Sequence, residues 1–162
     1  MNRHIRHIFG AFFVVSVLAL APATIRAEVT RVEITSRQDV LNGKAFGTVG
    51  AYEKLGGKVY FAVDPNNPHN KIIADIDKAP RNAQGKVEFS ADLFILRPKD
   101  SARGNGVALF DVVNRGGKGL LGVFNRAKSS SDPTAEADFG DGLLMREGYT
   151  LVAVDRKNSW RG

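Results

Sequence analysis

The sequence VALFDVV at residues 107–113, followed directly by NRGGKG at residues 114–119, decides the predicted fold. Residues 107–113 are almost continuously apolar, which is typical of a strand covered on both faces. Residues 120–127 have a weak helical pattern, and residues 141–147 can form a short helix that buries Leu143 and Leu144. Gly148 suits the position after a helix, and residues 149–154 form a second apolar strand. Strand, loop, helix and strand in this order predict one unit of a parallel sheet.

The chain before this unit has the patterns of antiparallel strands. Residues 29–35 alternate between apolar and polar side chains, which predicts a half-exposed strand. Residues 43–57 contain five glycines, so we expect mainly loop there, with a short extended piece at 51–53. Two further strands are predicted at 58–63 and at 87–96, the second ending before Pro98, which lacks a ladder donor.

The composition is that of a globular protein, and it excludes several chemistries. The chain has 162 residues, 43% of them hydrophobic and 25% charged, and it contains no cysteine. The lack of cysteine excludes disulfides, thiolate zinc sites, iron–sulfur clusters and cysteine nucleophiles. No H-E-x-x-H motif is present either. We therefore expect no metal and no cofactor.

Residues 1–27 have the layout of a secretory signal peptide. Arg3 and Arg6 precede a 13-residue apolar run at 8–20, and small residues follow, with cleavage predicted after Ala23 or Ala27. The apolar run is shorter than the ~20 residues that span a bilayer, so no stable membrane span is expected after cleavage. The predicted location is the periplasm or the medium.

Removal of this leader leaves a nearly balanced charge. The leader holds three arginines and no acid, so the remaining chain has 20 basic and 17 acidic residues. Nucleic-acid binding requires a concentrated basic face, and no such cluster remains. Nucleic acid is therefore not an expected partner.

The glycine-rich segments fit no nucleotide-binding motif. The GNGVAL segment at 104–109 lacks the third glycine of a dinucleotide fingerprint and precedes its strand. The GGKG segment at 116–119 has valine at 112, where a P-loop needs glycine, and Gly119 where it needs Ser or Thr. Two interpretations of 114–119 stay open: its backbone N–H groups contribute to an oxyanion hole, or its glycines only let the chain turn out of the sheet.

The groups that would complete an acyl-transfer site are not in the sequence. No serine lies in a G-x-S-x-G elbow. After the leader the only histidine is His69, and in the hydrolase order of serine, acid and histidine it comes too early to be the general base. We expect His69 to be a surface residue. No catalytic residue is assigned.

Three stretches resemble the N-terminal part of a secreted α/β-hydrolase domain family: GTVGAYEKLGG at 47–57, residues 107–117 ending in NRGG, and LMREGYTLV at 144–152. The resemblance implies an α/β fold in which N-terminal antiparallel strands lead into the first parallel strands of an incomplete hydrolase-like sheet. It also implies action on an ester or related acyl bond, with Arg115, Gly116 and Gly117 as the oxyanion-side loop.

The polar residues 155–162 fit no predicted element, so the chain is interpreted as a leader (1–27), an N-terminal part of a hydrolase-like domain (28–154) and a truncated or out-of-frame tail. Such a fragment would be inactive alone and would bind a small-molecule substrate only if a C-terminal part completed it. Its last strand, at 151–154, would then lack sheet and helix neighbours. The alternative is a small exported module with a binding or structural role and no catalysis.

Overall fold

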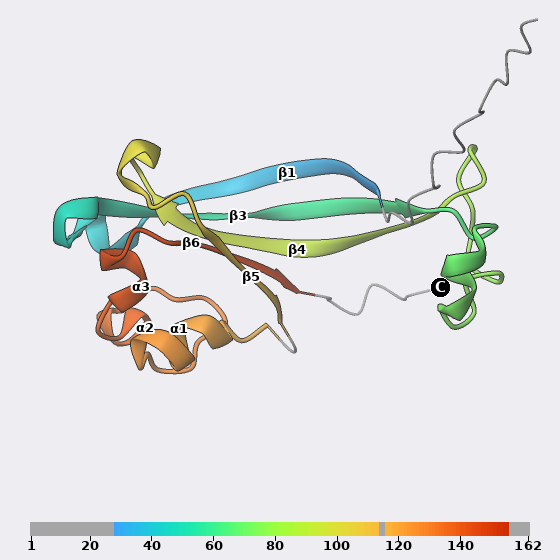
Figure 1. Ribbon diagram of the computed structural model, residues 1–162. Helices are drawn as coiled ribbons and strands as arrows, with labels where there is room; N and C mark the ends of the chain where they lie inside the picture. Colours follow the sequence, from blue (N-terminus) through green and yellow to red (C-terminus); the bar gives the residue numbers. More distant parts are fainter. Residues whose placement is uncertain (1–27, 114–115, 156–162) are drawn as a thin grey trace, which may run out of the picture.

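The computed structural model describes residues 28–113 and 116–155. Within these residues six strands form one sheet (Figure 1). The strands are β1 (Glu28–Asp39), β2 (Ala45–Phe46), β3 (Gly50–Val63), β4 (Val87–Pro98), β5 (Ala108–Val113) and β6 (Thr150–Asp155). The α-helices are α1 (Gly119–Asn125), α2 (Glu136–Phe139) and α3 (Leu143–Arg146). Four short 3-10 helices are η1 (Val40–Gly43), η2 (Gly47–Val49), η3 (Pro68–Ile72) and η4 (Ser101–Arg103).

The sheet is mainly antiparallel, so the predicted α/β class with a hydrolase-like sheet is wrong. The strand order is β1-β3-β4-β6-β5, and β2 pairs with β3. All of these pairings are antiparallel except that of β5 with β6. The strand–helix–strand unit was correctly predicted to give a parallel pair. That pair is only one margin of a sheet whose long strands meander antiparallel.

The glycine-rich stretch 43–57, predicted as mainly loop, is short 3-10 helices and the two-residue strand β2 up to Val49, but its second part, 50–57, belongs to the longest described strand. β3 starts at Gly50 and runs without a break through Gly56 and Gly57. A Cβ atom at Gly57 would collide with the backbone carbonyl oxygen of Glu33 on β1. Glycine is therefore needed inside this strand because two backbones approach closely. The same residue type was interpreted as a turn signal because the sequence does not show which backbone lies alongside.

β6 is an interior strand and β5 is an edge strand, whereas the sequence predicted that 107–113 would be covered and that 151–154 would lack neighbours. β6 lies between β4 and β5, and its Leu151 and Ala153 are only 3% and 6% exposed. β5, predicted to be covered on both faces, lies at the margin of the sheet, with Phe110 63% and Val112 72% exposed. The expectation that the last strand lacks neighbours is thus wrong. In this structure it is the strand before it that carries exposed apolar side chains.

The main core lies between one face of the sheet and the three α-helices, which gather below β5 and β6 in Figure 1. The strands contribute Tyr52, Leu96 and Leu151 to this core, and the helical region contributes Leu121, Phe139, Leu144 and Met145. The hydroxyl of Tyr52, which is fully buried, donates to the carbonyl of Tyr149 at 2.9 Å.

The predicted helix at 141–147 is confirmed only as a single turn, α3. Leu144 is buried as expected, but Leu143 is 40% exposed. Gly148 has φ of +75°, which confirms its predicted place after the helix. In the described part of the chain, no helix is both long and apolar enough to cross a membrane.

Buried Asn125 holds the helical region together. Its side-chain amide nitrogen donates to the carbonyl of Phe139 at 3.1 Å, and its side-chain oxygen accepts from the backbone N–H of Leu144 at 2.9 Å. Asn125 is 0% exposed, so these bonds form away from water. α2 and α3 are each only four residues long, too short to be stable alone, and Asn125 ties the end of α1 to both.

Candidate functional site

The predicted oxyanion loop follows β5, beside the carboxyl ends of the parallel strands β5 and β6. Ligands of parallel sheets commonly bind at such strand ends. Gly116 and Gly117 are described here, whereas Arg115 lies outside the described residues. Gly116 has φ of +80°, a conformation that favours glycine, and a Cβ atom there would lie 3.1 Å from a carboxylate oxygen of Asp155.

A small hollow of about 360 Å³ opens beside this loop. Its lining includes Asp92, Phe94, Gly116, Lys118, Ser131 and Asp155. Lys118 Nζ donates to the carbonyl of Gly116 at 2.7 Å and lies 5.0 Å from the centre of the Phe94 ring. Burial lowers the pKa of Lys118, and the carboxylates of Asp155 and Asp132 oppose that shift. The hydrogen bond from Lys118 uses the carbonyl of Gly116, whereas an oxyanion hole would use backbone N–H groups. The oxyanion role of residues 115–117 therefore stays a prediction.

His69, the histidine that could act with this loop, lies in a different part of the fold. His69 lies on η3, in the green segment at the opposite end of β3 and β4 from the helices (Figure 1). It is exposed, as predicted, and its backbone N–H donates to the side-chain oxygen of Asn67 at 3.0 Å. Within residues 28–113 and 116–155, no group of three or more His, Cys, Asp or Glu side chains could hold a metal ion.

The larger cavity, which the sequence analysis missed, measures about 800 Å³ and lies at that opposite end of the sheet. Strands β1, β3 and β4 form one part of its wall, and the segment 64–86 between β3 and β4 forms the other. The lining residues are Thr30, Arg31, Tyr60, Phe61, Val63, Asn70, Ile73, Ala74, Ile76, Ala79, Val87, Glu88, Phe89 and Ser90. Its volume is within the range of about 300–1,000 Å³ of small-molecule sites.

Local hydrogen bonds fix the start of the segment that closes the cavity. A turn follows β3 directly, and in it Asp64 Oδ1 accepts from the backbone N–H of Asn66 at 2.9 Å. Buried Asn70 donates from its side-chain nitrogen to the carbonyl of Asp64 at 2.8 Å. Farther along, Ile76 and Ala79 join Val63 and Val87 of the strands in a second buried cluster. The segment is therefore anchored to the sheet by polar and apolar contacts.

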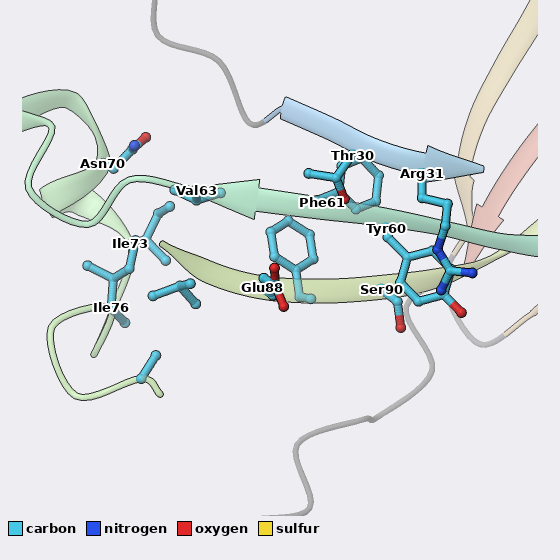
Figure 2. A pocket seen from close by; sticks show the side chains of 14 residues that line it. Thr30, Arg31, Tyr60, Phe61, Val63, Asn70, Ile73, Ile76, Glu88 and Ser90 are labelled. Atoms are coloured by element: carbon cyan, nitrogen blue, oxygen red, sulfur yellow. The ribbon is translucent and has the colours of Figure 1, made fainter. Parts of the chain in front are cut away.

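The cavity has an apolar aromatic wall. Phe61 on β3 and Phe89 on β4 are partners in the antiparallel register, and their rings stack with centroids 4.9 Å apart and planes 15° apart. Val63 and Val87 are the next pair on the same face, and Ile73 contributes from the segment 64–86. Figure 2 shows Val63, Ile73 and Ile76 gathered at one end and Phe61 near the middle.

The polar lining residues Arg31, Tyr60 and Ser90 lie close together in Figure 2, on the face of the strands opposite to the Phe61–Phe89 stack, because the Tyr60–Ser90 pair is next to the Phe61–Phe89 pair in the register. The Arg31 guanidinium lies 3.8 Å from the centre of the Tyr60 ring, a cation–π contact. Glu33 holds both groups, since its carboxylate accepts from Arg31 Nη1 at 2.9 Å and from the Tyr60 hydroxyl at 3.0 Å. One guanidinium nitrogen is thus occupied by Glu33, while the donors on the other nitrogens remain for a ligand.

The sequence contains one signal that could have indicated this cavity. Ile72, Ile73 and Ile76 lie in a segment otherwise rich in Asp, Asn, Lys and Pro, where a solvated loop would not need them. Ile73 and Ile76 line the cavity, whereas Ile72 is 90% exposed. The stacking of Phe61 on Phe89 could not be recognised because it depends on the register of strands 28 positions apart.

Comparisons of the chain with protein-family models, curated proteins and solved structures found no match.

Proposed function

We propose that this protein is a binding module, without catalysis, for a small molecule that combines an aromatic or other apolar body with a hydrogen-bond-accepting group such as a carboxylate. The cavity beside the Phe61–Phe89 stack carries the proposal. Eight of the fourteen lining residues are apolar, and the six polar ones include the opposite charges of Arg31 and Glu88; a mainly apolar lining with polar groups is the usual character of small-molecule sites. The predicted leader would place this binding outside the cytoplasm.

The orientation of the ligand follows from the two faces of the strands that line the cavity. The apolar body would lie against Phe61, Phe89 and Ile73, because removing such surface from water stabilises the complex by about 25 cal/mol per Å². The accepting group would extend to Arg31 on the opposite face of the strands and bond the guanidinium donors that Glu33 does not occupy. Ser90 and Tyr60 lie on the same face as Arg31, and the Tyr60 hydroxyl can still accept a bond.

The hydrolase function that the resemblance implies has less support. Its sheet is contradicted by the antiparallel order, and His69 lies on η3 at the far end of β3 and β4, away from the glycine loop after β5. The small hollow at Lys118 is also less than half the volume of the aromatic cavity. The non-catalytic module is therefore the function that the geometry favours.

Calorimetric titration with 2-naphthoate tests the proposal, since this probe has an aromatic body and one carboxylate. Phe89→Ala should weaken binding at least about tenfold, corresponding to 1.4 kcal/mol. Phe124→Ala is the matched control, because Phe124 lies on α1 outside the cavity and is 46% exposed against 43% for Phe89. 2-Naphthylmethylamine, with a cation in place of the carboxylate, should bind more weakly than 2-naphthoate. No binding of either compound, or equal losses in both variants, would contradict the proposal.

A further inference from the structure

The two margins of the sheet differ in how they are protected. Unpaired strand edges can pair with another chain, and proteins block them with charges, bulges or very short strands. β1 carries charged residues along its length, among them Arg31, Glu33 and Arg37, and its pairing with β3 is interrupted by two register irregularities. β5, at the other margin, has Asp111 as its only charged residue, and no irregularity interrupts its register with β6. Within residues 28–113 and 116–155, none of these features blocks the margin formed by β5.

The side chains of β5 alternate in a way that leaves one face apolar. Leu109 packs against the main core, and Val113 on the same face is buried. Ala108, Phe110 and Val112 point to the opposite face and are all exposed. No strand in the described part of the chain pairs with the outer side of β5. An edge strand with free backbone groups and exposed apolar residues is suited to accept another extended strand with apolar side chains on the same face.

We propose that two copies of this chain associate through β5, paired antiparallel about a twofold axis at Phe110. The chain's own β5 meets both requirements, because it is extended and its exposed face is apolar. A symmetric pair uses the same surface on both copies. The two sheets would join into one continuous sheet, and the aromatic cavity at the far end would stay open. The inference therefore goes beyond the proposed binding function and does not depend on it.

The charge of Asp111 favours the register centred on Phe110 over the register centred on Asp111. With Phe110 opposite Phe110 of the second copy, Leu109 lies opposite Asp111 and Ala108 opposite Val112, so no like charges meet. A shift of the axis to Asp111 would place two carboxylates directly opposite one another, which is destabilising in an antiparallel pair. A shift to Leu109 would place Val112 opposite Gly106, outside the strand. The axis at Phe110 aligns the whole Ala108–Val112 stretch.

The oligomeric state of the purified full chain, measured by light scattering or sedimentation over a range of concentrations, gives the first test. Val112→Lys should weaken association at least about tenfold, because an edge lysine blocks strand pairing. Val123→Lys is the matched control: Val123 lies on α1 and is 75% exposed, against 72% for Val112. If circular dichroism shows that Val112→Lys does not fold, Ala108→Lys tests the same face.

Single cysteines test the register, because the chain has no cysteine of its own and any disulfide must join two copies. Directly opposed residues have Cβ atoms about 4.5–5.5 Å apart, close to disulfide range. Phe110→Cys should therefore form the covalent dimer faster than Phe124→Cys on α1. A monomeric chain, loss of association in both lysine variants or in neither, or equal cross-linking of the two cysteines would overturn the proposal.

Discussion

The two adjacent glycines of the loop after β5 should respond oppositely to the same substitution. Gly116 has φ of +80°, and a Cβ atom there would lie 3.1 Å from the flexible end of Asp155. Gly117 has no positive φ, and a Cβ atom there would have no heavy atom within 4 Å. Alanine at 116 should therefore strain the backbone, whereas alanine at 117 should fit without a clash.

The backbone geometry sets the size of this difference. A left-handed conformation costs an L-residue about 1–2 kcal/mol, so Gly116→Ala should lower the free energy of unfolding by about that amount. The contact with Asp155 adds little, because a side-chain end can move by a few tenths of an ångström. Gly117→Ala should leave the stability unchanged or raise it by about 0.4–1 kcal/mol, since alanine restricts the unfolded chain.

Urea denaturation followed by circular dichroism measures both free energies, and calorimetry measures the midpoint temperatures. For a domain of this length, each kcal/mol should shift the midpoint by roughly 3–6 °C. Gly116→Ala should thus unfold several degrees below Gly117→Ala. Equal midpoints for the two variants, or a lower one for Gly117→Ala, would refute the loop conformation described here.

Three further predictions concern single polar side chains. Asn125→Ala should lower the free energy of unfolding by about 2–5 kcal/mol in urea denaturation, because it leaves two buried backbone groups without partners, the Phe139 carbonyl and the Leu144 N–H. Backbone N–H groups hold the pKa of Asp138 below its ordinary 3.8, so its stabilising contribution is present above that pH and is lost as the pH falls through the lower folded value. Denaturation midpoints measured across this acid range should therefore fall more steeply in the unaltered chain than in Asp138→Asn. Burial lowers the pKa of Lys118, so its NMR titration midpoint should lie below 10.5, and stability should rise with pH from that midpoint up to 10.5; a midpoint at or above 10.5 would contradict the burial of this amine.

Local patterns predicted the elements of this fold better than their arrangement. Alternation located the strands at 29–35 and 87–96, and Gly148 has the positive φ expected after a helix. The pattern failed at 50–57, where glycine serves a close approach of two backbones rather than a turn. It also failed for 107–113, because an apolar strand has the same sequence whether it lies inside a sheet or at its margin.

The candidate site was harder to predict because it depends on register. The sequence singled out Gly116 and its neighbours because glycine after a strand is a local signal. The aromatic cavity depends instead on the pairing of Phe61 with Phe89 and on the return of Ile73 and Ile76 to the sheet. Neither relation is visible in a window of neighbouring residues.

Two-dimensional NMR of the chain during titration with 2-naphthoate tests the binding function most directly. If the cavity binds this compound, the ring signals of Phe61 and Phe89 and the methyl signals of Ile73 and Ile76 should shift together and saturate. Shifts confined to the hollow around Lys118, or no saturating shifts at any of these groups, would contradict it.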